Sequence, residues 1–430
     1  MSGLAEVIHR AGYLVQGSDI RASEHSDRLV ALGIPVTVGH SPRNLKRASV
    51  VVVSAAVPQS NVEVLAAKRR GLTVVLRAEL VAEISRATTS IAIAGTHGKT
   101  TTSALIAAVL DAAKFHPTVL IGGYVHAYKS TGRLGESEWV VIEANESDGS
   151  FVLLDPTITV VTNIDREHMN FFQTLGREFS AFSEFVGRTR PHGCAVFCTD
   201  HPRVAELADR FIGAAKLTYG LRGDANVTAD NVRLFKGKSV FDAVIRLRKD
   251  GHTHVFNDLQ LPIPGIHNVQ NALAVIAVAQ SVQIDEASIR EGLCGYQGVG
   301  LRHRFVHIDD NVTVIEDYAH HPVEIAATLA AARIGASGRV IAIVEPSRHS
   351  RVSDLFHEFV ASFHSADVVL ITDIDARGES AIPGASSSQL ATAIAKAGHP
   401  CVAYVENHVS AGVTLRGMLQ AGDVVVLRPL

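Results

Sequence analysis

A glycine-rich stretch holds the residues with the clearest chemical potential. It spans residues 91–102 and reads IAIAGTHGKTTT. Its apolar start predicts a buried strand, its two glycines predict a turn, and Lys99 begins a predicted helix. This order aims backbone N–H groups and the positive end of a helix dipole at a phosphate. In such a loop Lys99 reaches the β- and γ-phosphates of a nucleotide, and the Thr100 hydroxyl is a ligand for Mg²⁺.

The loop is tighter than the general phosphate-loop pattern G-x-x-x-x-G-K-[ST]. Ile93 stands where that pattern has its first glycine, which leaves G-T-x-G-K-T. A glycine turn that contains a lysine by chance is the alternative explanation. We expect ATP to bind here, and the candidate nucleotide-binding residues are Gly95, Thr96, His97, Gly98, Lys99, Thr100 and Thr101.

Acidic residues follow the next predicted strand, residues 139–144, in the sequence EANESDGSF. A carboxylate at the carboxyl end of a strand beside a phosphate loop lies where a Mg²⁺ ligand is needed. Glu143 is therefore the preferred metal ligand. Asn145, Glu146 and Asp148 are either further site residues or solvated loop residues.

The strand predicted at residues 157–164 runs into a second polar cluster, which contains Asn163, Asp165, Glu167 and His168. A histidine at this point could ligate a second Mg²⁺. However, Mg²⁺ prefers oxygen ligands, and a lone histidine after a strand often has a structural role. The residues alone leave both roles open for His168.

A proline-glycine entry at residues 262–265 precedes a long apolar helix predicted from about residue 268. His267 and Asn268 lie at its N-terminus, where they can meet a ligand. Asn268 is equally suited to cap the helix.

A third α/β alternation begins near residue 312 and again places polar residues after strands. His320 and His321 follow one strand, and Arg348 and Arg351 follow the next. The carboxyl ends of parallel strands share one edge of a sheet, where such folds bind ligands. The arginines either bracket a phosphate or carboxylate with their fork geometry or are surface charges.

These residues need a large scaffold. A chain of 430 residues is too long for one core and predicts two to four domains. Before the phosphate loop, helices and strands alternate as in a doubly wound α/β unit, and residues 50–56 are typical of a parallel strand covered on both faces. In the amphipathic helix at residues 178–186, we expect Phe179, Phe182 and Phe185 in the core.

The composition excludes several classes of function. The net charge of −3 offers no footprint for nucleic acid, and no basic run suggests a membrane surface. The apolar stretches are shorter than a bilayer span, and no signal peptide is evident. Among the scattered cysteines, Cys194 and Cys198 are expected to be buried thiols instead of a metal pair. We expect a soluble, cytoplasmic protein.

We expect the sequence to be truncated at both ends. The sequence starts within a predicted helix, and Met1-Ser2-Gly3 resembles the tail of a glycine-rich loop. We expect that a central strand is missing and that the reading frame begins at an internal methionine. An upstream in-frame stop codon without glycine-rich coding sequence would contradict this. The last predicted strand is followed by no helix, so we expect truncation there as well.

The motifs taken together resemble the Mur ligases of peptidoglycan synthesis. In order along the chain they are GTHGKTTT, EANESDGSF, VVTNIDREHMN, LPIPGIHNVQNAL, EDYAHHPVE and the cluster at residues 347–351. The resemblance implies an α/β fold of three domains. These are a Rossmann-like UDP-sugar-binding domain (1–88), a phosphate-loop ATPase domain with a mostly parallel sheet and a small antiparallel part (89–296), and a Rossmann-like C-terminal domain (297–430).

The resemblance also implies a reaction. ATP would phosphorylate the carboxylate of UDP-N-acetylmuramate, and the amine of L-alanine would attack the acyl phosphate to give an amide, ADP and phosphate. This ligase would use Mg²⁺ and serve cell-wall synthesis, cell shape and division. It would have no nucleic-acid or membrane partner and would be a monomer or homodimer.

Residue roles are implied in the same way. Lys99 would hold the phosphates, Thr100 the first Mg²⁺, and Glu143 with His168 a second metal. Further nucleotide contacts would come from Asn163, His267, Asn268 and Arg304. The amino-acid and acyl-phosphate side would be lined by His320, His321, Arg348 and Arg351. The remaining substrate contacts would be Ser2, Gly3, Asp19, Ser54, Asn145, Glu146 and Ser147.

Two other functions stay open. One is a related amide ligase that recycles a muropeptide or extends folate with glutamate. The other is a truncated, non-catalytic protein that binds a nucleotide or a partner protein. The set Lys99, Thr100, Glu143 and His168 argues against the second.

The phosphate loop gives a first prediction. Replacing Lys99 with alanine removes the cation that would hold the β- and γ-phosphates, so turnover should be abolished while the fold stays intact. Phosphate release from Mg²⁺-ATP measures the turnover, and circular dichroism checks the fold. An unaltered rate would remove the phosphate loop from the mechanism.

Overall fold

The structure is a computed structural model that describes residues 1–246, 252–309 and 311–428. The chain divides into two compact units. The first contains Met1–Thr228, Ile245–His252 and Leu273–Gly292, and the second contains Ala229–Val244, Thr253–Ala272 and Leu293–Leu430. Within the described ranges, no helix is long and apolar enough to cross a membrane.

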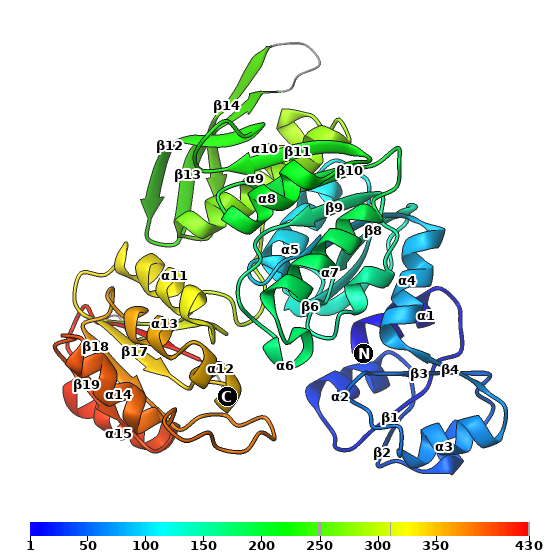
Figure 1. Cartoon of the computed structure of the whole chain (residues 1–430), viewed down its shortest axis with the longest axis horizontal. Coiled ribbons are helices and arrows are strands. Elements are labelled where there is room, and N and C mark those ends of the chain that lie inside the picture. Colours follow the sequence, from blue (N-terminus) through cyan, green and yellow to red (C-terminus); the bar gives the residue numbers. More distant parts are fainter. Residues whose placement is uncertain (247–251, 310, 429–430) are drawn as a thin grey trace. The chain divides into compact units, whose positions relative to one another are not determined.

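The N-terminal region alternates short helices and strands, as expected, but its strands do not join into one sheet. The parallel pair β1–β2 forms one two-stranded sheet, and the parallel pair β3–β4 forms another. The elements, blue in Figure 1, are α1 (Ser2–Arg10), β1 (Gly17–Asp19), α2 (Glu24–Ala31), β2 (Val36–Val38), η1 (Pro42–Leu45), β3 (Val50–Val53), α3 (Val62–Arg69), β4 (Thr73–Leu76) and α4 (Arg77–Ala87).

The expectation that β3 is covered on both faces is wrong. A small cluster around the fully buried Ala67 packs against Val51 and Val74. The neighbouring Val50 is 51% exposed. Successive side chains of a strand point to opposite faces. The β-branched run therefore indicated a strand correctly, but it did not show how many of its faces are buried.

The N-terminal helix α1 is bound to β7 by a close backbone approach. A Cβ atom on Gly3 would lie 2.7 Å from the carbonyl carbon of Thr131, and one on Gly132 would lie 2.5 Å from the Gly3 carbonyl oxygen. Beside this contact, the buried Glu6 carboxylate accepts from the Ser130 hydroxyl at 2.6 Å and from Arg28 at 2.8 Å. A segment close to the start of the chain is thereby fixed to the central sheet.

The central sheet carries the phosphate loop. The described strands follow the order β14-β13-β12-β11-β10-β9-β5-β8-β6-β7. The strands from β10 through β6 in that order are parallel, and β7 pairs antiparallel with β6. The first elements are β5 (Thr89–Ala94), α5 (Lys99–Ala112), β6 (Thr118–Val125), β7 (Ser130–Arg133), β8 (Trp139–Glu143), η2 (Ser150–Leu153) and β9 (Ile158–Val161).

The remaining elements of this part of the chain are α6 (Met169–Phe172), α7 (Leu175–Gly187), β10 (Cys194–Cys198), α8 (Pro202–Arg210), β11 (Ala215–Gly220), β12 (Val227–Phe235), β13 (Lys238–Arg246), β14 (Thr253–Leu261), α9 (Ile266–Ser281) and α10 (Glu286–Cys294). Cys194 and Cys198 are buried free thiols, as predicted. Burial raises their pKa values to about 11 and about 12. Both thiols are therefore protonated at neutral pH.

Helix α7 differs from its predicted packing at one position. Phe182 and Phe185 are fully buried, but Phe179 is only partly buried, and the guanidinium of Arg210 lies over its ring at 5.4 Å. The position before it, Glu178, is 0% exposed, and neither carboxylate oxygen has a partner in the described chain. Burial raises the pKa of Glu178 to about 8. This side chain therefore carries a proton at neutral pH.

The C-terminal region, yellow to red in Figure 1, forms a separate sheet in the order β15-β16-β20-β17-β18-β19. All neighbours are parallel except β15 and β16. Its elements are β15 (Arg304–Asp309), β16 (Val312–Glu316), α11 (Pro322–Arg333), β17 (Val340–Val344), α12 (His349–Asp354), α13 (Phe356–Ala361), β18 (Val368–Ile371), α14 (Ser387–Lys396), β19 (Val402–Tyr404), α15 (His408–Met418) and β20 (Val424–Leu427).

The two faces of this sheet have separate cores. One cluster joins α11, α13 and α14 to the sheet through side chains such as Leu329, Phe359 and Leu390. The other joins α15 to the opposite face through Ala411, with Leu415 packed against it. This two-sided cover leaves the carboxyl ends of the parallel strands as the edge where loops with polar residues gather.

The buried Glu6 gives a prediction for stability. Burial alone would raise the pKa of Glu6, but hydrogen bonds from Ser130 and Arg28 outweigh it and hold the pKa below the usual value of 4.5. The stability that it contributes is present above pH 4.5 and is lost as the pH falls through the lowered pKa. Replacing Glu6 with Gln should lower the unfolding free energy by about 2 kcal/mol at pH 7.

Chemical denaturation at pH 7 and below pH 4 measures this effect, and the difference from the wild type should shrink at the lower pH. The exposed Glu138, whose side chain has no hydrogen bond or ion pair with another described residue, provides the matched control Glu138→Gln. A loss of equal size in both variants would contradict the assignment.

Candidate active site

The phosphate loop depends on two glycines with positive φ angles. Gly95 has φ 138° and Gly98 has φ 81°, and α5 begins at Lys99 immediately afterwards. A Cβ atom on Gly95 would lie 2.0 Å from the Thr162 hydroxyl oxygen and 3.0 Å from the Asn163 backbone nitrogen. No side chain fits in this space. The loop therefore lies directly against the segment that follows β9.

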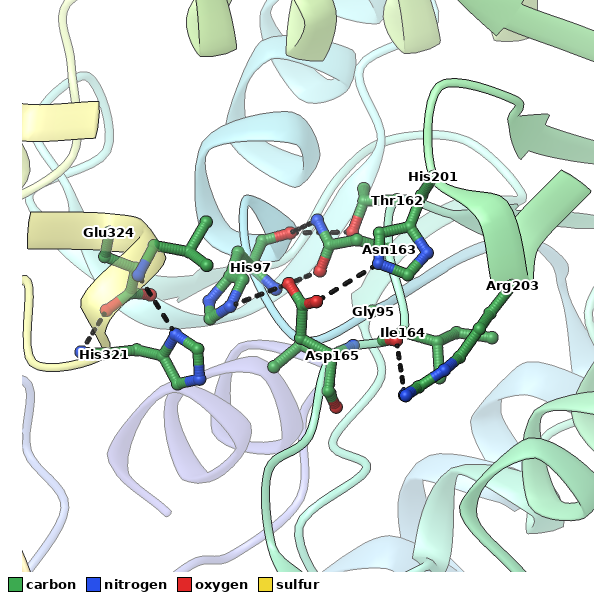
Figure 2. A network of polar contacts seen from close by, with 12 residues as sticks. Gly95, His97, Thr162, Asn163, Ile164, Asp165, His201, Arg203, His321 and Glu324 are labelled. Carbon is green, nitrogen blue, oxygen red and sulfur yellow. Dashed lines mark hydrogen bonds and ion pairs between the residues drawn. The ribbon is translucent and has the colours of Figure 1, made fainter. Parts of the chain in front are cut away.

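The segment after β9 holds the phosphate loop through hydrogen bonds to the loop backbone (Figure 2). The Thr96 N–H donates to the Asn163 carbonyl at 3.1 Å. The Asn163 side chain accepts from the His97 N–H at 2.7 Å and donates to the His97 carbonyl at 3.0 Å. The Thr162 hydroxyl also donates to that carbonyl, at 2.7 Å. In this structure both ends of the Asn163 amide hold the loop, and its predicted contact with a nucleotide stays a prediction.

Lys99 lies folded against its own loop. Its ammonium donates to the carbonyl oxygens of Gly95 and Thr96 and to Glu146 Oε1, the last at 2.8 Å. Burial alone would raise the pKa of Glu146, but Lys99 and His168 outweigh it and lower that pKa. Glu146 is thus a buried carboxylate that compensates the charge of Lys99. A bound anion at the loop would offer the ammonium a second negative partner.

Two oxygen ligands suited to a hard cation meet at the end of β8. The Thr100 hydroxyl donates to Glu143 Oε1 at 2.9 Å, and the Gly122 N–H donates to Glu143 Oε2 at 2.6 Å. Carboxylate and hydroxyl oxygens are the ligand types that Mg²⁺ prefers. The two oxygen groups therefore suit Mg²⁺, and the predicted assignment of Thr100 to a first metal and of Glu143 to a second stays a prediction.

His168 has different neighbours. Its Nε2 lies 3.5 Å from Glu146 Oε1, and its Nδ1 lies 3.9 Å from Glu167 Oε1. No hydrogen bond or ion pair joins His168 to Glu143 in the described residues. In the described ranges, moreover, no group of three or more His, Cys, Asp or Glu side chains is arranged to hold a metal. The second metal site, which would need His168 and Glu143 together, stays a prediction.

His201, which the sequence analysis did not single out, joins the predicted residues His97 and Asp165 in a network of polar contacts (Figure 2). Asp165 lies between two imidazoles, with His97 Nε2 3.3 Å from Oδ2 and His201 Nε2 3.2 Å from Oδ1. Burial alone would raise the pKa of Asp165, but the hydrogen bonds from His201 and His97 hold it well below its usual range. The sequence feature that could have indicated His201 is its place in the loop after β10. The carboxyl end of β10 lies at the same edge of the sheet as those of β5 and β9.

The predicted histidines of the second unit lie in a network of hydrogen bonds at the start of α11. Burial lowers the pKa of His320 to about 4, and its Nδ1 lies 2.9 Å from the Tyr318 carbonyl. His321 caps α11, since its Nδ1 accepts from the Val323 N–H at 3.3 Å. Glu324 Oε2 accepts from the backbone N–H groups of both histidines, at 3.2 and 3.4 Å. The two-histidine motif is therefore held rigidly at the start of the helix.

Residues at the start of α9 are also held internally. Burial lowers the pKa of His267 to about 4. The Asn268 amide donates to the Pro264 carbonyl at 2.7 Å. Because α9 already begins at Ile266, Asn268 lies within the first turn, and its alternative role as the N-cap is wrong.

The three predicted arginines have different surroundings. Arg351 is 8% exposed, and its guanidinium donates to the Ser347 carbonyl at 3.0 Å, so it is not a solvated surface charge. The backbone N–H of Arg348 donates to the Asp375 carbonyl at 2.8 Å. Arg304 is exposed and forms a cross-strand ion pair with Glu316 at 3.3 Å.

Among the described residues, no hydrogen bond or ion pair brings all the predicted substrate residues together in one place. Ser2 and Gly3 lie in α1, Asp19 ends β1, and Ser54 follows β3. The Asn145 amide donates to the Ser147 hydroxyl at 2.9 Å within the loop after β8. Glu146 alone among the substrate residues joins the Lys99 network.

This geometry defines an α/β protein with a phosphate loop, a buried lysine–carboxylate pair and oxygen ligands for a metal at the edge of a parallel sheet. Comparison with known protein families shows matches along the chain. Residues 1–89 match the family described as Mur ligase family, catalytic domain, residues 93–279 match the Mur ligase middle domain, and residues 302–429 match the Mur ligase, glutamate ligase domain. The chain belongs to the Mur ligase family, whose chemistry is ATP-dependent ligation.

Individual relatives agree with this assignment. The chain is 45% identical to UDP-N-acetylmuramate--L-alanine ligase of Agrobacterium fabrum over 427 residues, which is 99% of this chain and 91% of that protein. It is also 45% identical to the ligase of the same name from Paracoccus denitrificans over 429 residues, 99% of this chain and 90% of the other.

Solved structures show the same three-domain fold. The UDP-N-acetylmuramate-alanine ligase of Thermotoga maritima matches with a TM-score of 0.80 and 26% identity, over 100% of this chain and 92% of that chain. A murein peptide ligase from Psychrobacter arcticus matches in fold with a TM-score of 0.70 and 21% identity, over 100% and 93% of the two chains.

The close approach at Gly95 gives a prediction for nucleotide binding. A methyl group forced into a filled site costs about 1–3 kcal/mol. Gly95→Ala should therefore displace the loop and weaken ATP binding by roughly tenfold or more. Isothermal titration with a non-hydrolysable ATP analogue measures the effect.

Gly187→Ala in α7 is the matched control, because a Cβ atom there meets nothing within 4 Å. Unchanged ATP affinity in Gly95→Ala would show that the loop tolerates displacement, contrary to the geometry.

Proposed function

We propose that this chain joins L-alanine to the carboxylate of UDP-N-acetylmuramate in an ATP-dependent step of peptidoglycan precursor synthesis. The observation that carries the proposal is the 45% identity over 99% of the chain to enzymes with this named activity. We assign residues 1–88 to UDP-sugar binding, 89–296 to ATP binding and 297–430 to the amino-acid side. The expected cytoplasmic location and the monomeric or dimeric state belong to this proposal.

The reaction needs charge stabilisation more than a nucleophilic side chain. A carboxylate oxygen of the sugar attacks the γ-phosphorus, and the bond to the leaving ADP oxygen breaks. The amine of L-alanine then attacks the acyl carbon, inorganic phosphate leaves, and the amine gives up its protons to solvent or a basic group. The phosphoryl group and the tetrahedral intermediate are both anionic.

The residues of the phosphate loop suit the first step. The N–H groups at the start of α5 and the ammonium of Lys99 would bind the phosphates, with Glu146 holding the lysine until the nucleotide arrives. Thr100 and Glu143 would hold Mg²⁺, which when bound neutralises phosphate charge. For Glu143 with His168 as a second metal site, the support is the resemblance alone.

The residues of the second unit suit the amine and acyl-phosphate side. Arg351, buried and anchored on Ser347, is a fixed cation for an anionic group. His320, with its pKa of about 4, is uncharged at neutral pH and can exchange hydrogen bonds with a bound ligand without adding charge. Arg348 and His321 complete this proposed set, and Asn163, His267, Asn268 and Arg304 remain proposed nucleotide contacts.

The alternative functions have less support. The likeness to a murein peptide ligase at 21% identity bears on the fold alone. A non-catalytic role has to account for the pairing of Thr100 with Glu143 and of Lys99 with Glu146 at the loop.

The proposal predicts alanine-dependent phosphate release. The purified chain with Mg²⁺-ATP and UDP-N-acetylmuramate should release phosphate when L-alanine is added, and Lys99→Ala should not. The same assay with a muropeptide in place of L-alanine tests the recycling alternative. Release that depends on the muropeptide but not on L-alanine would contradict the proposed function.

A further inference from the structure

His201 is the residue outside the predicted site that is most closely connected to it. It occupies the N-cap position of α8, directly after β10. Strand β9 lies between β10 and β5 in the sheet, and all three are parallel. The segment after β10 is therefore the next one along the sheet edge from the segment after β9, which holds the phosphate loop.

Helix α8 contacts the β9 segment at two points (Figure 2). His201 Nε2 lies 3.2 Å from Asp165 Oδ1. Two residues further, the Arg203 guanidinium donates to the Ile164 carbonyl at 3.1 Å. The first turn of α8 thus contacts the backbone carbonyl of Ile164 and the side chain of Asp165, the next residue in the chain.

The contact with Asp165 determines where its second oxygen points. An ionised carboxylate only accepts hydrogen bonds, so the Nε2 atom of His201 is the donor in its contact with Oδ1. With Oδ1 engaged by His201, rotation of the carboxylate is restricted, and Oδ2 faces His97 Nε2 at 3.3 Å. The orientation of the His97 ring in the phosphate loop therefore depends on a group in α8.

The backbone of Asp165 joins the same loop. Its N–H donates to the Thr96 hydroxyl at 2.8 Å, and that hydroxyl lies 3.4 Å from the Asp165 carbonyl. Displacement of Asp165 would thus act on two adjacent loop residues, Thr96 and His97. Groups that hold the residues contacting a ligand commonly change affinity or activity by about 10–100-fold when removed.

We propose that His201 is a positioning residue of the ATP site, which acts through Asp165 to hold Thr96 and His97 of the phosphate loop in the conformation that binds nucleotide. The inference rests on the proposed function only in that ATP binds at this loop. It does not depend on which amine or carboxylate is joined.

The test compares nucleotide binding in variants of the full chain. His201→Ala should weaken binding of a non-hydrolysable ATP analogue, measured by calorimetry, by about tenfold. In turnover assays the KM for ATP should rise while the KM for L-alanine stays unchanged. His201→Gln, whose amide nitrogen can occupy the place of Nε2, should restore affinity to near the wild-type value. His192→Ala, an exposed histidine before β10, is the matched control and should change nothing.

A double-mutant cycle with Asp165→Asn separates positioning from general destabilisation. If His201 acts through Asp165, His201→Ala should cause little further loss of ATP affinity in the Asp165→Asn background. Additive losses, equal changes in both KM values, or a Gln variant no better than Ala would each overturn the proposal. If His201→Ala does not fold, the Gln variant and Asp165→Asn decide by the same binding measurement.

The experiment also keeps the two proposals apart. A wild-type chain that binds the ATP analogue but does not use L-alanine contradicts the proposed function and leaves the role of His201 testable by binding. A wild-type chain that binds no nucleotide overturns the positioning role as well.

Discussion

The contact between the phosphate loop and the segment after β9 is the constraint on which the rest of the site depends. It requires a glycine at position 95, because the Thr162 hydroxyl fills the space that a Cβ atom would take. It also requires Asn163, whose amide pairs with both backbone groups of His97. Since β5 and β9 are adjacent parallel strands, their carboxyl ends bring the two loops together. The sheet thus holds the two loops against each other.

Charge around this loop is arranged in compensated pairs. Lys99 is paired with the buried Glu146, and Asp165 is paired with two imidazoles. A buried charge without a partner is costly, which explains why Glu146 lies against the ammonium of Lys99 and why an imidazole donates to Asp165. Glu178 illustrates the alternative, since a buried carboxyl without a partner keeps its proton and its pKa rises to about 8. A polyphosphate would enter a site in which the cation is already in place.

In the second unit, burial acts on histidines, whose pKa values it lowers. Burial lowers the pKa values of His267, His303 and His320 to about 4, and the permanently charged Arg351 adds to this lowering at His320. Tyr318, in the same motif as His320, lies beneath the guanidinium of Arg428 at 5.0 Å. This part of the second unit therefore combines neutral imidazoles with more than one arginine guanidinium.

Local sequence signals were sufficient for the elements that carry the strongest patterns. The apolar run before Gly95 and the helix from Lys99 correspond to β5 and α5, and the resemblance to Mur ligases is confirmed by matches along the chain. Helices α4 and α15 and strands β6, β7 and β15 were not predicted, because their weaker patterns are completed only by packing. Exposure was also misjudged, as Val50 shows, since burial depends on which other elements cover a strand.

The sequence by itself therefore indicated the class of chemistry, because glycines, a lysine and a threonine at this spacing after an apolar strand are typical of a phosphate loop. Only the tertiary structure decided which polar residues support it. His201 and Asp165 are 36 positions apart, and Lys99 and Glu146 are 47 positions apart. No local pattern links residues so far apart. Their contacts arise because parallel strands that are adjacent in the sheet, although distant in the chain, end at the same edge.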